Sequence, residues 1–317
     1  MERREFLRFA LGAVAFSGCT PKAGVSGTVR LGYLANLTHA PALVAVASGR
    51  VAHALPGVKI ETKTFRAGPR VCEALLGNAI DIGVSGPGPI VSMHARHAGN
   101  PFVLVSGVTS GGASLVVLPS IKDSGDLHGK RVASPQIGST PDVSLRKWLS
   151  RNGLLPKERG GDVTIDALAS ADILAQMRRG QIVGAWLPEP WATRIVVELG
   201  AVRLVDERDL WTEHRFPTAL VVVRRAFYEA RRPEVDAVVS AIHEEIGRAK
   251  TDPRMPGEAF AEIKRLTTKG LLKPVMDASW KRLDFTTDPI PRALEQMAVD
   301  ARDLGYVPRA DLSGLLT

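Results

Sequence analysis

From residue 28 onward, the chain alternates between two hydrophobic patterns. Short apolar runs such as 102–108 and 219–223 predict buried strands, whereas longer segments with apolar residues three and four positions apart, such as 140–152, predict amphipathic helices. Glycine, proline and polar residues separate these segments. Strands are expected at 28–33, 58–65, 80–84, 102–108, 131–134, 163–167, 183–187, 201–205 and 219–223. Helices are expected at 41–49, 68–76, 87–97, 140–152, 169–179 and 190–199.

The repeated strand–helix order predicts an α/β protein with parallel, helix-covered sheets. Gly111 and Gly112 interrupt the first series, a second series follows, and the pattern after Arg224 becomes almost purely helical and charged. We therefore expect two lobes joined by two hinge crossings, near 110–114 and 216–220, with a ligand cleft between the lobes. Two domains with a single crossing are disfavoured, because the C-terminal helices would then have no sheet to cover. The expected boundaries are 28–112 plus 217–317 for lobe 1 and 113–216 for lobe 2.

The N-terminus has the pattern of an export signal followed by a tether. Arg3 and Arg4 begin a segment that resembles a twin-arginine signal, and a short apolar stretch leads to Cys19 in a segment that resembles a lipobox. We expect residues 1–18 to be a signal peptide, residues 19–27 a tether, and Cys19 a lipidation site. The alternative is a chance basic start on a cytosolic protein, and the order of the three features favours export.

Composition narrows the class of protein. Of 317 residues, 45% are hydrophobic and 23% are charged, as in ordinary globular proteins. No apolar run reaches the roughly 18 residues that span a bilayer. The formal charge of +8 is scattered along the chain, so it suits an anionic small molecule or membrane surface better than nucleic acid. With Cys19 lipidated, Cys72 has no partner, and we expect it to be a small buried residue without a disulfide.

The turns after four predicted strands are rich in glycine, proline and hydroxyl residues. They occupy 34–41, 66–69, 85–89 and 135–142. Ligands of open α/β sheets bind where strands end and helices begin, because helix N-termini present free amides and partial positive charge. One helix N-terminus favours an anion by roughly 0.3–1 kcal/mol, and a hydrogen bond to a charged group contributes roughly 1.5–3 kcal/mol. Three or four converging turns would reach the roughly −8 kcal/mol of micromolar binding, although capping alone can explain any single turn.

The segment from Trp186 to Trp191 ends a strand and begins a helix. Trp186 can form an apolar wall for an alkyl group, and Glu189 can meet an amine or orient hydrogen-bond donors. Packing between the lobes is an equal alternative for these two residues, and packing is favoured for Trp191.

Five further side chains have two interpretations each. Arg66 and Arg70 can reach an anion directly, but solvated surface arginines fit their positions better. His39 can donate to an anion or serve as a polar residue of the first helical turn. His94 and His97 are three residues apart without a third ligand nearby, so a solvated helix face is favoured over a metal site.

Six segments between residues 28 and 225 carry a resemblance to a known family. They are 32–42 (GYLANLTHAPA), 65–69 (FRAGP), 81–89 (DIGVSGPGP), 110–116 (SGGASLV), 126–148 (DLHGKRVASPQIGSTPDVSLRKW) and 185–194 (AWLPEPWATR). Together they resemble the substrate-binding lipoproteins of bacterial ABC importers for nitrate, sulfonate and taurine. Residues 135–146 and 185–192 are most similar to the aliphatic-sulfonate branch of that family. The resemblance implies a two-lobed type II periplasmic-binding-protein fold, hinge closure, and delivery of a ligand to permease and ATPase subunits.

The resemblance also implies where the ligand binds. The residues at or near the cleft are Asn36, Thr38, His39, Gly68, Ser85, Gly86, Gly112, Ser139, Thr140, Trp186 and Glu189. We expect an exported monomer, held by a lipid anchor at the periplasmic or extracellular face of the membrane, that binds a small anion. No cofactor, metal, catalytic residue or nucleic-acid partner is expected.

Two other classes of function remain open. The sequence has no Walker A loop, G-x-S-x-G, H-E-x-x-H or C-x-x-C motif, which favours a binding protein over an enzyme. The main alternative is a cytosolic two-lobed enzyme of pyrimidine or quinone-precursor biosynthesis with the same fold. A sensory effector module ranks last, because no helix-turn-helix or membrane-spanning segment accompanies the two lobes.

Overall fold

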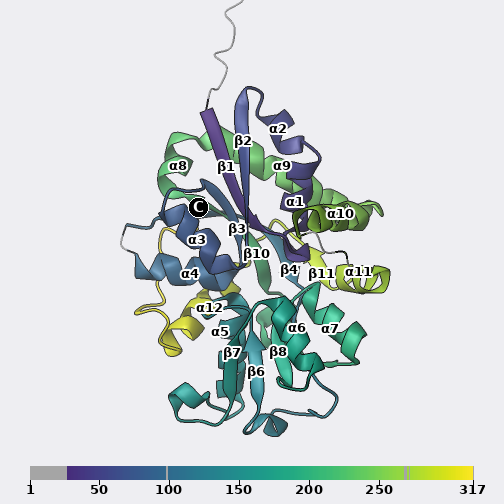
Figure 1. The fold of residues 1–317 in the computed structure, drawn as a ribbon. Coiled ribbons are helices and arrows are strands. Elements are labelled where there is room, and N and C mark those ends of the chain that lie inside the picture. The colour runs from purple at the N-terminus through teal and green to yellow at the C-terminus, as the bar shows by residue number, and fades with distance from the viewer. Residues whose placement is uncertain (1–26, 98, 268–269, 271, 317) are drawn as a thin grey trace, which may run out of the picture.

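The computed structural model describes residues 27–97, 99–267, 270 and 272–316, which form two helix-covered β-sheets (Figure 1). The predicted signal peptide and Cys19 lie outside the described residues. In spatial order, the first sheet contains β11 (Leu283–Phe285), β4 (Phe102–Gly111), β10 (Pro217–Arg224), β3 (Ile82–Ser85), β1 (Gly27–Leu34) and β2 (Val58–Phe65). The second sheet contains β7 (Thr164–Ala167), β6 (Arg131–Ser134), β8 (Gly184–Pro188), β5 (Ala113–Val117) and β9 (Val202–Asp206).

Helices pack on both faces of each sheet. On the first sheet, one face is covered by α1 (Ala40–Ala47), α9 (Arg232–Thr251) and α10 (Met255–Thr267), and the other by α3 (Gly68–Leu76) and α4 (Pro87–Arg96). On the second sheet, α5 (Thr140–Arg151) covers one face, and α6 (Ser170–Arg178) and α7 (Trp191–Leu199) cover the other. The remaining helices are α2 (Arg50–Ala54), α8 (Arg225–Ala230), α11 (Lys273–Trp280) and α12 (Pro291–Asp303).

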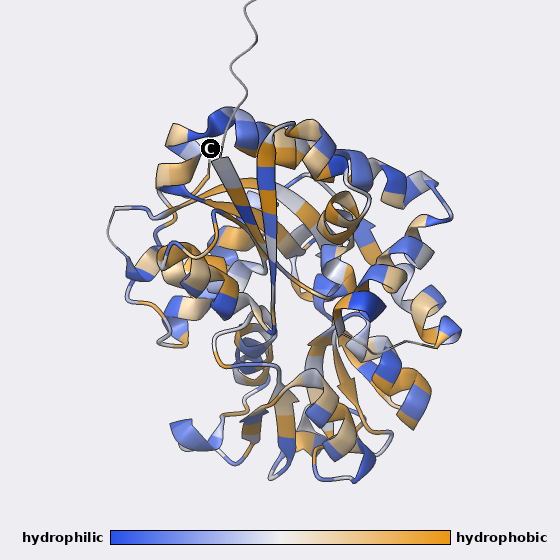
Figure 2. Ribbon diagram, turned by 45° about the horizontal axis from the view of Figure 1, so that its top comes forward, coloured by the Kyte–Doolittle hydropathy of each residue, from blue (hydrophilic) through white to orange (hydrophobic). Residues whose placement is uncertain are grey.

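The hydrophobic pattern explains this layering. Figure 2 shows hydrophobic residues concentrated in the strands, whereas the helices alternate hydrophilic and hydrophobic positions. Every residue of β3 and β5 is buried, while β2, at the sheet edge, is mostly exposed. Burial of one large apolar side chain contributes about 1.5–3 kcal/mol. Cys72 is fully buried in α3, as predicted, and this burial raises the pKa of its thiol to about 12.

The sheets were expected to be parallel, but both contain parallel and antiparallel pairs of strands. Strand β10 runs antiparallel to β3 and β4, and β5 runs antiparallel to β8 and β9. These are the strands beside the crossings, and their direction depends on how the chain returns between the halves rather than on local hydrophobic pattern. For the same reason, the short strand β11 was not expected in the C-terminal region, and β5 was not expected directly after the glycine pair.

The chain crosses between the two sheets twice, and the two crossings lie next to each other. In the first crossing, Gly111 and Gly112 have φ angles of 69° and 73°, a left-handed conformation that favours glycine. A hydrogen bond of 3.0 Å from the Gly111 amide to the Phe216 carbonyl joins this crossing to the second. The Phe216 amide in turn donates to the Ser110 hydroxyl at 3.3 Å. The predicted α/β class with two crossings is therefore confirmed.

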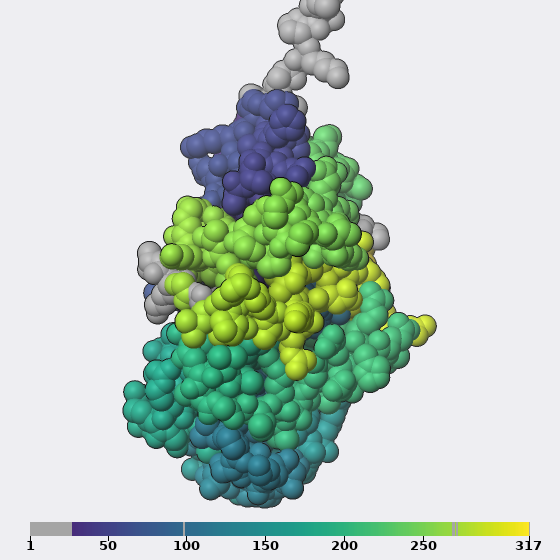
Figure 3. Space-filling view, turned by 90° about the vertical axis from the view of Figure 1, so that its right-hand side faces the viewer, coloured from purple at the N-terminus to yellow at the C-terminus, as the bar shows by residue number. Residues whose placement is uncertain are grey.

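The C-terminal helices return to the junction of the two halves. Figure 3 shows the yellow-green and yellow C-terminal segments as a band between the purple N-terminal segment and the teal second half. Within the part of the chain that the structure describes, no helix is both long enough and apolar enough to cross a bilayer.

Candidate functional site

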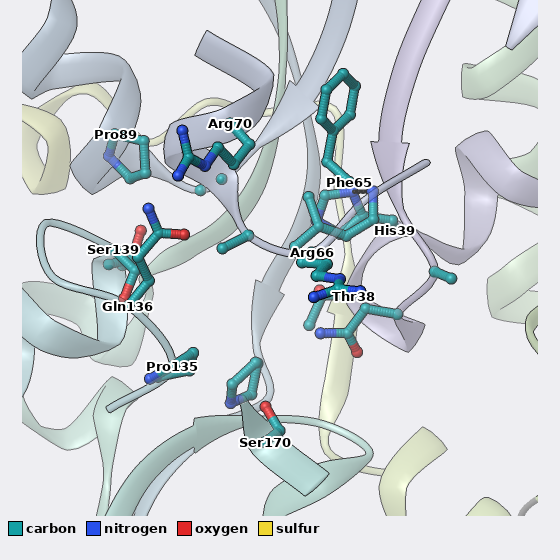
Figure 4. Close-up of a pocket in the computed structure, with 18 of the residues that line it drawn as sticks. Thr38, His39, Phe65, Arg66, Arg70, Pro89, Pro135, Gln136, Ser139 and Ser170 are labelled. Atoms are coloured by element: carbon teal, nitrogen blue, oxygen red, sulfur yellow. Dashed lines mark hydrogen bonds between the residues drawn. The ribbon is translucent and has the colours of Figure 1, made fainter. Parts of the chain in front are cut away.

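A large cleft of about 1280 Å³ lies between the two sheets. Its first-sheet wall comes from residues within 34–39, 63–74 and 86–89, and its second-sheet wall from residues within 135–141 and 169–171 together with Pro188 and Trp191. Phe216 and Thr218, beside the crossings, also line it. Figure 4 shows side chains from both walls around this space, with His39, Phe65 and Arg66 on one side and Gln136 and Ser139 on the other.

Helix N-termini from both halves meet at the cleft. The residues immediately before α3, α4, α5 and α6 all line it, and none of them makes a side-chain capping hydrogen bond. They are Ala67, Gly86, Ser139 and Ala169. In α4 the Gly88 amide donates to the Thr140 hydroxyl, whereas the first turns of α3, α5 and α6 have no side-chain cap. These uncapped first turns and the partial positive charge of each helix start make the cleft suited to an anion.

Many of the predicted site residues are brought together here. The predicted residues that line the cleft are Asn36, Thr38, His39, Gly68, Gly86, Ser139 and Thr140. The other predicted residues, Ser85, Gly112, Trp186 and Glu189, are absent from its lining.

Asn36 and Ser139 present unpartnered polar atoms from opposite walls. The side chains are 9% and 5% exposed, and neither Asn36 Oδ1 nor Ser139 Oγ has a hydrogen-bond partner in the described part of the chain. Leaving a buried polar atom unsatisfied costs about 1–3 kcal/mol, so such atoms in a cleft indicate a place for a polar ligand or water.

His39 is a neutral donor. The ring is 2% exposed, and burial lowers its pKa to about 3. The Leu34 amide donates to Nδ1 at 3.4 Å, which leaves the proton of the neutral ring on Nε2. His39 can therefore donate one hydrogen bond to a ligand without carrying a charge.

Thr140 contacts the first half directly. Its hydroxyl accepts a 3.1 Å hydrogen bond from the Gly88 amide in α4. A Cβ added at Gly86 would lie 2.4 Å from the Thr140 hydroxyl, and one at Gly88 would lie 3.0 Å from Thr140 Cα. Glycine at these two positions therefore allows α5 to approach the start of α4.

Ser85 and Gly112 support the site from behind. The Ser85 hydroxyl is fully buried and donates to the Gly68 carbonyl at 3.3 Å. Gly112 lies in the first crossing, where its carbonyl accepts from the Glu189 amide at 2.8 Å and an added Cβ would meet Leu283 at 2.3 Å. These contacts give both residues a structural role.

Trp186 and Glu189 point into the second half instead of the cleft. Both are fully buried, and Trp186 Nε1 donates to Glu207 at 2.8 Å. Glu189 accepts from the Thr193 amide at 3.0 Å and from Arg203 at 2.8 Å. Their polar groups are thus satisfied within the protein.

Further lining residues include Glu207, which was not predicted, and Arg66 and Arg70, for which the sequence favoured a surface position over contact with an anion. Glu207 reaches the cleft wall, and burial raises the pKa of its carboxyl to about 7. Arg66 and Arg70 also line the cleft, but Arg70 forms a 2.7 Å ion pair with Glu73, whereas Arg66 has no ion pair with any described residue. The position of Arg66 directly after β2 was the signal available in the sequence.

The histidine pair is a correction to the sequence analysis. His94 is 2% exposed rather than solvated, and its Nε2 lies 3.2 Å from the Ser313 carbonyl. His97 Nδ1 lies 2.8 Å from the Met93 carbonyl in the preceding turn. No group of three metal-binding side chains occurs among the residues that the structure describes.

Comparison with known proteins assigns the family. Residues 23–255 match the model of the NMT1-like family. The chain belongs to this family. A taurine-binding periplasmic protein of Escherichia coli is 30% identical to this NMT1-like chain over 196 residues, which are 62% of this chain and 58% of the relative.

Solved structures confirm the two-lobed fold. The alkanesulfonate-binding protein SsuA from Xanthomonas axonopodis, solved with bound MOPS, has a TM-score of 0.75 at 22% identity, over 92% of this chain and 98% of that one. The nitrate-binding protein NrtA from Synechocystis has a TM-score of 0.74 at 17% identity, over 90% and 83% of the two chains. The taurine-binding relative is a binding protein rather than an enzyme, which weighs against the enzyme alternative.

Proposed function

We propose that this NMT1-like chain is an extracytoplasmic solute-binding protein that delivers a small sulfonate or related oxyanion to an ABC importer. The observation that carries the proposal is the convergence of four helix N-termini on one interlobe cleft, three of which, those of α3, α5 and α6, have no side-chain cap. Such a site binds an anion through neutral donors and needs no reactive group.

The ligand would lie between the two walls. Asn36, Thr38, His39 and Gly68 would contact it from lobe 1, and Ser139 and Thr140 from lobe 2. We propose the boundaries 28–112 plus 217–317 and 113–216 for these lobes, with Gly112 and Phe216 in the hinge. Partial closure on the ligand would desolvate it and strengthen each hydrogen bond.

Export and anchoring belong to the same proposal. The taurine-binding relative is periplasmic, and the arginine pair and Cys19 at the N-terminus suit an exported lipoprotein. Permease and ATPase subunits would be the partners of the monomeric binding protein.

Titration calorimetry with ethanesulfonate, taurine, nitrate and sulfate tests the proposal, with ethylammonium as a cationic control. We expect at least one of the four anion-containing ligands to bind with micromolar affinity and ethylammonium to show no heat. Absence of binding by all four would refute an oxyanion-binding function.

Ser139→Ala sharpens this test. Because the Ser139 hydroxyl has no partner among the described residues, its removal should leave the thermal midpoint unchanged while affinity falls about tenfold, the worth of one ligand hydrogen bond. Ser134→Ala is the matched control, since the Ser134 hydroxyl donates to Asp142 at 2.9 Å and its loss should lower the midpoint. A Ser139→Ala variant with a lower midpoint and full affinity would contradict the role of this hydroxyl in binding.

A further inference from the structure

The C-terminal segment contacts both halves of the protein beside the cleft. Helix α12 packs against α4 of the first half and α5 of the second (Figure 1). Val91, Val143 and Met297, one from each of these helices, belong to a single buried apolar cluster that Tyr306 extends. The segment after α12 is therefore part of the junction between the lobes.

Tyr306 is anchored by its backbone to the first half. Arg96, at the end of α4, donates from Nε to the Tyr306 carbonyl at 2.8 Å. The Tyr306 amide donates to the Ala301 carbonyl of α12, also at 2.8 Å. These bonds fix the base of the side chain on the lobe 1 side.

The Tyr306 hydroxyl reaches the second half. It donates to Asp142 Oδ2 at 2.5 Å, and Asp142 is fully buried in the first turn of α5. The same carboxylate accepts from the Gly138 amide at 2.9 Å and from Arg146 Nε at 3.1 Å. Asp142 thereby connects Tyr306 to the loop between β6 and α5.

That loop forms part of the ligand site. Pro135, Gln136 and Ser139 line the cleft, and Ser139 carries one of its unpartnered polar atoms. We propose that Tyr306 is a positioning residue, which through Asp142 holds the 135–139 loop and the start of α5 against lobe 1 in the geometry that binds the anion. This inference rests on the proposed function, because it assigns a role to Tyr306 in the same site.

The hydrogen bond from Tyr306 to Asp142 also affects the electrostatics of the anion site. A buried carboxylate near the start of α5 opposes a bound anion unless donors offset its charge. Arg146 and Tyr306 are such donors, and burial together with the Asp142 charge raises the pKa of Tyr306, so that its hydroxyl keeps its proton. Neighbouring ion pairs from Lys147 to Asp300 and Asp303, at 3.2 and 3.0 Å, join α5 and α12 along the same interface.

Tyr306→Phe tests the inference, with Tyr228→Phe as control because Tyr228 lies on α8, where its ring contacts Arg232. Hydrogen–deuterium exchange of the peptide 135–143 is measured without ligand, and ethanesulfonate affinity by calorimetry. We expect Tyr306→Phe to speed exchange in this peptide several-fold and to weaken affinity about tenfold, with an unchanged exchange rate elsewhere. Tyr228→Phe should change neither quantity.

A second variant distinguishes a local effect on the 135–139 loop from a general loss of stability. Arg96→Gln removes the Arg96 hydrogen bonds to the Tyr306 carbonyl and leaves the tyrosine side chain in place, so an increase in exchange in the same peptide is expected. Unchanged exchange in 135–143 for both variants overturns the inference, as does faster exchange with undiminished ethanesulfonate affinity. If the wild-type protein binds none of the four test ligands, the proposed function fails instead, and the exchange result alone decides whether Tyr306 holds the loop.

Discussion

The two walls of the cleft hold their polar groups in different ways. On the first wall, the supports come from the same half: Thr109 donates to the Thr38 carbonyl at 2.7 Å, and the Leu34 amide donates to His39. On the second wall, the loop before α5 depends on Asp142 and, through it, on Tyr306 from the C-terminal segment. The first wall is thus preorganised by its own sheet, whereas the second responds to how the halves meet.

The largest expected difference between the two walls is in the pH range over which their buried titratable residues change charge. His39, with its pKa lowered to about 3, stays neutral over the range in which Glu207, with its pKa raised to about 7, loses its proton. Between the ordinary pKa of 4.5 and about 7, the folded protein keeps a proton at Glu207 that the unfolded chain has released. Over the same range the His39 contribution rises with pH, because below its ordinary pKa of 6.5 the unfolded imidazole holds a proton that the folded ring lacks. The Glu207 contribution to stability should fall by about 3 kcal/mol in total as pH rises through this window and be constant above it.

Urea unfolding at pH 5 and pH 8 measures this loss. Because the His39 contribution is common to both proteins, the loss is the difference in pH dependence between the wild type and Glu207→Gln, which cannot ionise. Glu229→Gln, on the exposed side of α8, should behave like the wild type. An equal change of stability between pH 5 and pH 8 in the wild type and Glu207→Gln would show that Glu207 does not titrate in this range.

Contact between the walls is tested by Gly86→Ala. The added Cβ would lie 2.4 Å from the Thr140 hydroxyl, so α5 must move away from α4 or the methyl group must displace Thr140. Because the φ of Gly86 is −75°, alanine introduces no backbone strain. We expect affinity for the best ligand of the calorimetric panel to fall about hundredfold, the loss of two ligand hydrogen bonds from the second wall.

Gly247→Ala is the matched control for this change. Gly247 lies in α9, and an added Cβ there meets nothing within 4 Å. Its affinity should equal that of the wild type. If Gly86→Ala also binds normally, the second wall does not need its close approach to α4 in order to bind the ligand.

The difference between the walls also explains what sequence reasoning could find. The turns at 66–69, 85–89 and 135–142 carry their signal locally, since glycine, proline and hydroxyl residues directly after a strand mark a helix start. Helix α3 has the predicted bounds, and the predicted bounds of α4 and α5 are each one residue too long. Local patterns therefore sufficed for the elements that carry the helix N-termini.

Long-range pairing was beyond such patterns. Trp186 and Glu189 looked available for a ligand because their partners, Glu207 and Arg203, come 14 or more residues later in the chain. The hydrogen bond from Tyr306 to Asp142 spans 164 positions. No window along the sequence indicates that the C-terminal segment returns to the cleft.

The smallest expected effect concerns the exposed cations of the first wall. Arg70 already pairs with Glu73 at 2.7 Å, whereas Arg66 has no ion pair with a described residue and points into the cleft in Figure 4. An exposed charge near an anion contributes little and is screened by salt. Arg66→Gln should weaken anion binding about threefold at 20 mM salt and less at 200 mM, as measured by calorimetry.

Arg70→Gln provides the comparison within the same wall. Arg70→Gln leaves Glu73 without its ion-pair partner. Because Arg70 pairs with Glu73 instead of contacting the anion, we expect this variant to change anion affinity only through the net charge near the cleft. Both variants lose one positive charge, and a purely long-range field would therefore weaken binding equally in the two. A larger, salt-sensitive loss of affinity for Arg66→Gln indicates direct contact with the anion. Equal losses of affinity would mean that the first wall contributes only its buried neutral donors and a general positive potential.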